Sequence, residues 1–97
     1  MRLRLSAFAD TDLKGVYERG WDNFGEAQAD RYYDGLLDAF ERIRLHPQAA
    51  RKRIVEGHEF RVRRYKSHSI VYQLLDDEIV ITRVLHGAQD LKRNLPG

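Results

Sequence analysis

The sequence predicts an α+β fold of β-α-α-β-β-β order, in which a helical hairpin packs on one face of a mostly antiparallel sheet. Two patterns carry this prediction. Apolar residues recur at spacings of three and four over residues 7–45, which indicates two amphipathic helices. Apolar and polar residues alternate over much of residues 60–86, and β-branched residues dominate the end of that stretch, which indicates three successive strands. Residues 1–97 are expected to form a single domain.

The N-terminal half begins with alternating residues 2–6, which we expect to form a short strand that joins the sheet. Ser6 is a suitable N-cap for a helix over residues 7–23, because its hydroxyl can accept from an unpaired first-turn amide. Gly25 ends that helix, and a second helix is expected over residues 26–45. The short connection predicts an antiparallel hairpin. The apolar stripes of the two helices contain Ala9, Leu13, Val16, Tyr17, Gly20 and Phe24, and then Ala29, Tyr32, Tyr33, Leu36, Leu37, Phe40 and Ile43.

The C-terminal half is interpreted as a loop over residues 48–59, which show no clear period, followed by the sheet. After a first strand that begins at Phe60, strands are expected over residues 67–75 and 78–86, joined by a turn at Asp76 and Asp77. Apolar residues occur on both faces of the last two strands, which suggests that one face carries the helices and the other meets a partner. An ordinary number of exposed apolar residues is the alternative. The tail is expected to form one helical turn around residues 90–94.

Charge is distributed unevenly along the chain. The formal net charge is +2, but residues 1–50 carry −2 and residues 51–97 carry +4. Arginine outnumbers lysine thirteen to four, and residues 51–66 hold seven basic side chains against two acidic ones. Such a patch favours an acidic partner, either nucleic acid or an acidic protein segment, and arginine suits bidentate pairing with carboxylate or phosphate. A solvated basic surface remains the alternative.

The composition also limits the compartment and the chemistry. The chain has no cysteine, so disulfides and thiolate metal sites are excluded. It lacks the apolar run of a signal peptide and any stretch long enough to span a membrane, so we expect a soluble cytoplasmic protein without a membrane partner. The four histidines lack metal-ligand spacing, and no Gly-rich phosphate loop or nucleophile elbow is present. We therefore expect no metal and no cofactor.

A metal-free ribonuclease would need only an acid, a base and cations on the phosphate. His86, Arg83 and Arg61 could supply these groups, with Glu59 as a base. Each group also has a structural reading. His86 could be a strand-end imidazole bonded to the backbone, and Arg83 could be ion-paired.

Several stretches of this sequence resemble the ParE-type toxins of bacterial toxin–antitoxin systems, within the RelE/ParE superfamily. Their order and spacing carry the resemblance, which extends over nearly the whole chain. The stretches are residues 6–13, where a strand meets a helix; 24–29 with Tyr32 and Tyr33, at the helix junction; 57–60 and 67–72, in the central strands; and 83–91, the closing motif.

The resemblance implies a RelE/ParE-like fold and a ParD-like antitoxin that wraps and silences the toxin in a hetero-oligomer. It also implies that the free toxin poisons DNA gyrase without catalysis of its own. RelE-type relatives instead cleave mRNA on the ribosome, with basic side chains on the sheet and a Tyr or His near the C-terminus. The tail after His86 has neither, which favours the gyrase-poison branch. A ribosome-dependent mRNA endoribonuclease is the alternative, and a plain nucleic-acid-binding module is a third.

Candidate contact residues follow from these expectations. Aromatic residues and arginine are enriched among residues that dominate binding energy. For the antitoxin we expect contacts at Tyr17, Trp21, Arg61, Arg63 and Arg83, although packing at the hairpin tip is an alternative role for the two aromatics. For the target we expect contacts at His86, Asp90 and Leu91.

Overall fold

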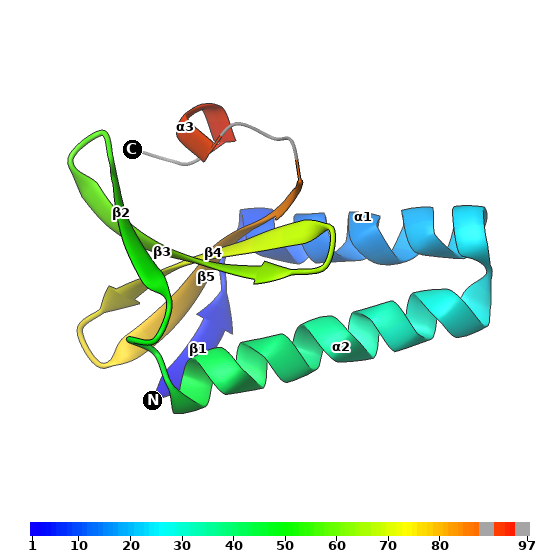
Figure 1. Ribbon diagram of the computed structural model, residues 1–97, viewed down its shortest axis with the longest axis horizontal. Helices are drawn as coiled ribbons and strands as arrows, with labels where there is room; N and C mark the ends of the chain where they lie inside the picture. The colour runs from blue at the N-terminus through cyan, green and yellow to red at the C-terminus, as the bar shows by residue number, and fades with distance from the viewer. Residues whose placement is uncertain (88–90, 95–97) are drawn as a thin grey trace.

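The computed structural model, which describes residues 1–87 and 91–94, has two layers, a helical hairpin and a five-stranded sheet (Figure 1). The strand order is β1-β5-β4-β3-β2, and every pairing is antiparallel except the parallel pairing of β1 with β5. The predicted α+β fold class is therefore confirmed. The strands are β1 (Arg2–Leu5), β2 (Arg51–Val55), β3 (His58–Tyr65), β4 (His68–Leu75) and β5 (Glu78–His86).

The hairpin consists of α1 (Ala7–Phe24) and α2 (Glu26–Leu45), so both predicted helices agree with the structure to within one residue. The Ser6 hydroxyl accepts from the Ala9 amide at 3.0 Å and donates to the Thr82 carbonyl at 2.8 Å. This N-cap therefore also ties the start of α1 to β5. At the other end Gly25 has φ 86°, a backbone conformation that favours glycine, and its N–H donates to the Trp21 carbonyl at 3.0 Å.

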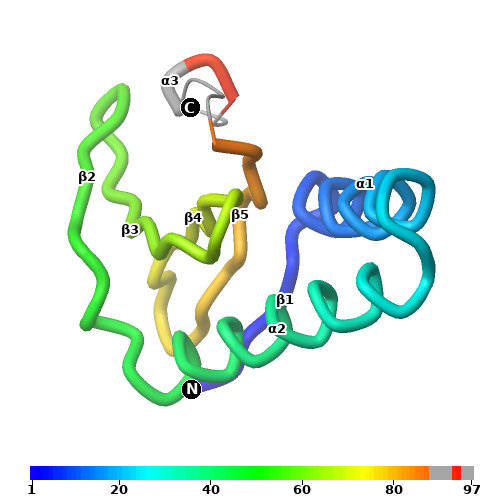
Figure 2. The backbone as a smooth tube through the Cα atoms, turned by 45° about the vertical axis from the view of Figure 1, so that its right-hand side comes forward, coloured from blue at the N-terminus to red at the C-terminus, as the bar shows by residue number. Residues whose placement is uncertain are grey.

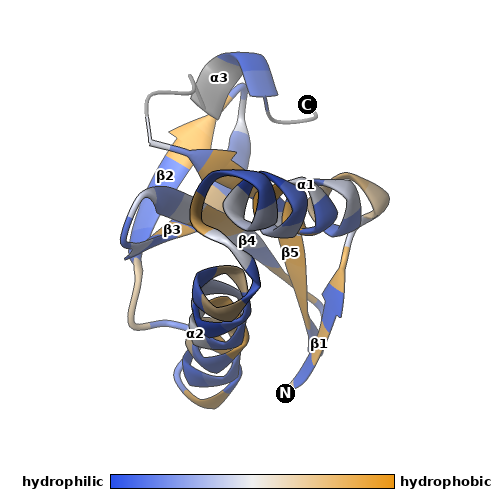
Figure 3. Ribbon diagram, turned by 90° about the vertical axis from the view of Figure 1, so that its right-hand side faces the viewer, coloured by the Kyte–Doolittle hydropathy of each residue, from blue (hydrophilic) through white to orange (hydrophobic). Residues whose placement is uncertain are grey.

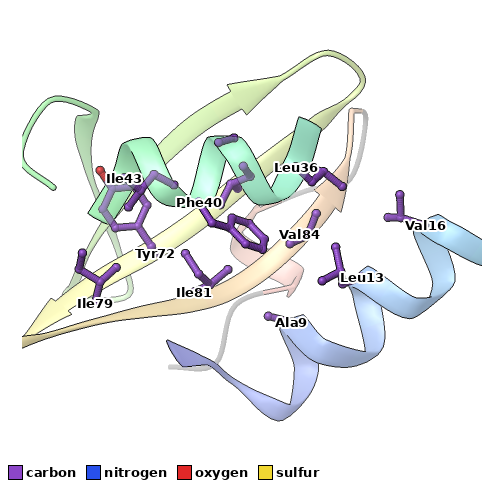
Figure 4. Close-up of a cluster of buried hydrophobic side chains, with 12 residues drawn as sticks. Ala9, Leu13, Val16, Leu36, Phe40, Ile43, Tyr72, Ile79, Ile81 and Val84 are labelled. Carbon is purple, nitrogen blue, oxygen red and sulfur yellow. The ribbon is translucent and has the colours of Figure 1, made fainter. Parts of the chain in front are cut away.

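Both helices cover one face of the sheet, and the main core lies between the two layers (Figure 3). Figure 4 shows side chains of α1 and α2 pointing toward the side chains of β4 and β5. Tyr72 is 1% exposed, and its hydroxyl reaches past the core to donate to the Pro47 carbonyl at 2.8 Å. The buried members of this cluster are Ala9, Leu13, Val16, Leu36, Ala39, Phe40, Ile43, Ile70, Tyr72, Ile79, Ile81 and Val84.

The prediction of a loop over residues 48–59 was wrong, because β2 lies within it and β3 begins at His58. β2 pairs only with β3, and four of its five residues are exposed. An edge strand of this kind has no buried face that would impose alternation on its sequence, and basic side chains protect such an edge against unwanted pairing. Glu56 at φ 52° and Gly57 at φ 80° form the tight turn that joins the two strands.

The hairpin tip departs from the predicted apolar stripes. The tip extends beyond the end of the sheet, which the tube in Figure 2 also shows. Phe24, a member of the predicted stripe of α1, is consequently 66% exposed, and Trp21 in the same turn is 48% exposed. Leu37, farther along α2, is 41% exposed although it belongs to the second stripe. The spacing was correct for a helix, but sequence periodicity does not state where the sheet beneath that helix ends.

The opposite face of the sheet has a small cluster of its own. Phe60, Val71 and Leu85 are at most 1% exposed, and Val55 and Val62 pack against them. Val71 and Leu85, two of the apolar residues that suggested a partner on this face, are therefore buried at its centre, whereas Leu75 at the end of β4 is 44% exposed.

α3 (Leu91–Asn94) is a single short helix, in the region where one helical turn was expected around residues 90–94. Asp90 lies outside the described residues. Within residues 1–87 and 91–94, no helix has the length and hydropathy needed to cross a bilayer.

Two helical glycines give opposite expectations for the same substitution. A Cβ on Gly15 would lie 2.9 Å from the Nη1 atom of Arg19, the flexible end of a side chain that can move aside. Gly15→Ala should raise the free energy of unfolding by about 0.5–1 kcal/mol through helix propensity. A Cβ on Gly35 would lie 2.6 Å from Cζ of the half-buried Tyr65 ring. Gly35→Ala should therefore lower stability by about 1 kcal/mol despite the propensity gain. Urea unfolding of both variants checks the opposite signs.

Candidate binding pocket

A pocket of about 420 Å³ lies between the hairpin and the strand ends at Ser67, His68 and His86. The helices contribute an apolar wall that includes Val16, Gly20, Phe24 and Ala29. The helices approach closely here, since a Cβ on Gly20 would lie 3.4 Å from the Ala29 Cβ atom. The remaining lining side chains are polar, and they are Arg19, Asn23, Gln28, Tyr32, Ser67, His68 and His86.

Hydrogen bonds around Tyr32 fix the polar side of the pocket. The Ser67 N–H donates to the Tyr32 hydroxyl at 3.2 Å, and that hydroxyl lies 2.8 Å from Nδ1 of His68 and 3.4 Å from the Tyr65 carbonyl. Which group donates in the 2.8 Å contact between the Tyr32 hydroxyl and Nδ1 depends on the tautomer of His68. The fixed network holds His68 in one orientation at the base of β4.

His68 and His86 are direct partners in the β4–β5 register, and their ring centroids lie 5.2 Å apart in an edge-on arrangement. Burial, together with repulsion from His86, Arg19 and Arg64, lowers the pKa of His68 to about 4. His68 is therefore neutral at physiological pH. Its lowered pKa makes it a poor general base. Part of the lowering is due to the basic side chains around the pocket.

Arg61 is buried, at 8% exposure. Its Nη1 donates to the carbonyls of Gln48 and Ala50, at 3.0 and 2.7 Å, which fixes the segment between α2 and β2. Its Nε is buried without a hydrogen-bond partner among the described residues. The guanidinium thus serves the fold, at some cost in desolvation.

Arg61→Ala is therefore expected to lower the free energy of unfolding by about 1.5 kcal/mol, since two charge-assisted bonds are lost but the unpaired Nε is removed. The matched change Arg63→Ala, at a half-buried position two residues along β3, should cost less than about 0.5 kcal/mol. Thermal unfolding of both variants tests this difference. Equal losses would contradict the assignment of a structural role to Arg61.

Arg83 makes three hydrogen bonds within the chain. Its Nε and Nη2 donate to the Asp12 carboxylate at 2.7 and 2.9 Å, and its Nη1 donates to the Asn94 carbonyl at 2.7 Å. The Asp12 pairing raises the pKa of Arg83. In the sheet, Arg83 pairs with Val71 whereas Arg61 pairs with Tyr72, so these two arginines belong to opposite faces. His86 lines the pocket, and Glu59 pairs with Lys52 at 3.6 Å on an exposed surface, so the four groups considered for a ribonuclease lie in different settings.

The remaining predicted contact residues lie on α1, β3 and the C-terminal segment. Tyr17 donates to Asp30 at 2.6 Å, a bond that raises the tyrosine pKa to about 12, and its ring packs edge-on against Tyr33. Trp21 is half exposed in the last turn of α1. Leu91 begins α3.

The sequence analysis missed Arg19, Tyr32 and His68 as pocket residues. One signal was available for His68. Strands that flank the turn at Asp76 pair nearly symmetrically about it, which brings His68 close to His86, and a bulge at Val71/Tyr72 completes the register. Arg19 could not be found this way, because it reaches the pocket only through the packing of the helices on the sheet.

The architecture defines the class of protein, a small α+β domain with a helical hairpin on one face of the sheet. It is shared with a solved structure titled "Chromosomal ParDE TA system from P. aeruginosa", with a TM-score of 0.75 over 89% of this chain and 95% of that one, at 19% identity. The model of the family described as ParE toxin of type II toxin-antitoxin system, parDE, matches residues 3–91. This chain therefore belongs to the ParE toxin family, as the resemblance in its sequence predicted.

Relatives from two strains of Mycobacterium tuberculosis agree with this assignment. The proteins named Toxin ParE1 from strains CDC 1551 / Oshkosh and ATCC 25618 / H37Rv are each 28% identical to this chain over 95 residues. The alignment covers 97% of this chain and 97% of each relative. The similarity therefore extends over the whole fold and is not limited to one motif.

Proposed function

We propose that this ParE-family toxin is held silent by a ParD-like antitoxin and that the free chain poisons DNA gyrase in the cytoplasm. The observation that carries the proposal is the family match over residues 3–91. The basic second half of the chain supports an acidic protein partner. Within the described residues, no group of three His, Asp or Glu side chains gathers in a way that could hold a metal ion.

The structure favours some of the expected antitoxin contacts over others. Trp21 is exposed and Arg63 is partly exposed, so both can contribute directly to an interface. Arg61 and Arg83 are bonded within the chain, so we propose that they support the interface by fixing β3 and β5. Tyr17 supports the interface through its hydrogen bond to Asp30, which joins the two helices of the hairpin.

A supercoiling assay with purified gyrase tests the proposed target. Micromolar free toxin should inhibit the introduction of supercoils or trap cleaved DNA, and the protein encoded by the adjacent reading frame should restore activity when added in equal amount. Unaffected gyrase at high toxin concentration would contradict the proposed target. Cleavage of translating mRNA in the same preparation would identify the endoribonuclease alternative instead.

A further inference from the structure

We propose that the pocket beneath the hairpin tip receives an anchor from the antitoxin, a large apolar side chain whose nearest neighbour in the partner is a carboxylate. This inference rests on the proposed function, and it names the chemistry by which the partner is recognised. The pocket of about 420 Å³ is near the small end of the range of about 300–1,000 Å³ for ligand sites. It has room for one or two side chains of a partner.

The apolar part of the anchor follows from the helical wall of the pocket. Phe24 lines the pocket and remains 66% exposed, although it belongs to the apolar stripe of α1. Val16, Gly20 and Ala29 complete a wall of small and apolar side chains. Burying a large apolar side chain against this wall removes it from water, which favours binding.

The carboxylate follows from the basic side chains that surround His68. Arg19 and His86 line the pocket directly, and Arg64 is close enough to disfavour protonation of His68. Lys66 lies over the Tyr32 ring, 5.8 Å from its centroid. Among the described residues, no carboxylate pairs with Arg19. A partner carboxylate would therefore gain a charge-assisted contact, and no internal ion pair of Arg19 would be broken.

Gly15 gives Arg19 the space that this contact needs. The Arg19 guanidinium lies back along α1, and its Nη1 atom is 2.9 Å from the place where a Cβ on Gly15 would be. A methyl group at Gly15 would displace the guanidinium without changing the charge of the protein. Gly15→Ala therefore tests whether the position of the guanidinium matters, because the charge itself is retained.

The first experiment uses small probes and does not require the antitoxin. Amide ¹H–¹⁵N spectra of the toxin are recorded during titration with N-acetyl-L-phenylalanine, with its uncharged amide and with acetate. The carboxylate-bearing aromatic probe should bind with a dissociation constant in the millimolar range and shift the signals of Arg19, Gly20 and His68. Each of the other two probes should bind at least tenfold more weakly. Equal binding of acid and amide, or shifts confined to other surfaces, would overturn the proposal.

The second experiment measures affinity for the protein encoded by the adjacent reading frame. Arg19→Glu should weaken binding at least thirtyfold and Gly15→Ala about fivefold. The matched control is Arg42→Glu, the same charge reversal at an exposed α2 position outside the pocket, and it should change affinity less than threefold. Circular dichroism confirms that each variant is folded.

The outcomes separate this inference from the proposed function. If the wild-type toxin binds the antitoxin and Arg19→Glu binds equally well, the pocket assignment is wrong while the proposed function stands. If the wild-type toxin binds no antitoxin, both fail. Tight binding of a mixed-sequence oligonucleotide that displaces N-acetyl-L-phenylalanine would identify the pocket as a nucleic-acid site and would also overturn the proposal.

Discussion

Asp12→Ala is expected to lower the free energy of unfolding by about 3 kcal/mol, because it removes one partner of a largely buried ion pair. The Asp12 and Arg83 side chains are only 16% and 17% exposed, and the carboxylate accepts two bonds from the guanidinium. It also accepts from the Val84 N–H at 2.9 Å. Without Asp12, a guanidinium and a backbone donor of β5 lose their partner.

The location of this ion pair explains the size of the expected effect. β1 ends at Leu5, so β5 continues beyond its parallel neighbour and exposes the edge on which Val84 lies. The Asp12 carboxylate supplies the acceptor that a neighbouring strand would otherwise provide. Arg83 also donates to the Asn94 carbonyl and lies 5.7 Å from the centroid of the Phe8 ring, so one guanidinium joins α1, β5 and α3.

The control for Asp12→Ala is Asp10→Ala on the same helix. Asp10 pairs with Lys14 at 3.1 Å on an exposed surface, where an i,i+4 pair contributes about 0.3–0.5 kcal/mol. Urea unfolding at pH 7 should therefore give a loss for Asp12→Ala several times larger than the loss for Asp10→Ala. Similar losses for the two variants would show that the Asp12–Arg83 pair does not stabilise the fold as argued.

The second large effect is a loss of stability in mild acid that depends on His68. The folded protein lowers the His68 pKa from 6.5 to about 4, whereas the unfolded chain restores the ordinary value. Between these values the unfolded state binds a proton that the folded state resists. Stability is therefore fully present above pH 6.5 and declines as the pH falls toward 4. With allowance for partial solvation, we expect a contribution of about 2 kcal/mol.

Histidine variants isolate this contribution from the titration of other groups. His68→Gln removes the group, so its loss of unfolding free energy between pH 7 and pH 4.5 should be about 2 kcal/mol smaller than that of the wild type. His58→Gln, at an exposed position on β3, should retain the wild-type pH dependence. Parallel pH profiles for the wild type and His68→Gln would contradict the proposed desolvation of His68.

Local signals were sufficient for most of the fold. The Ser6 cap and Gly25 delimit α1 because each acts through its own backbone geometry or hydrogen bonds. The turn at Asp76 was found for the same reason, and Asp76 adopts φ 52° there. β2 was missed because its pairing with β3 is set by the sheet and not by a pattern of its own.

The site was less accessible from sequence because it depends on contacts between distant residues. His86 was found as a titratable strand-end residue, but Tyr32 is 36 residues from His68 in the chain and reaches it only in the folded molecule. Arg83 was predicted as a contact residue with an ion pair as the alternative, and the packing of α1 against β5 identifies Asp12 as its partner. Charge type was predictable, whereas the partner of each charge was not.

Growth of a bacterial host after induction of this chain tests the central claim most directly, the claim that the protein is a toxin silenced by a second chain. Induction of the toxin alone should stop growth, and co-expression of the adjacent reading frame should restore it through a complex that can be purified. Normal growth at high levels of the folded toxin, together with no stable complex, would contradict the account.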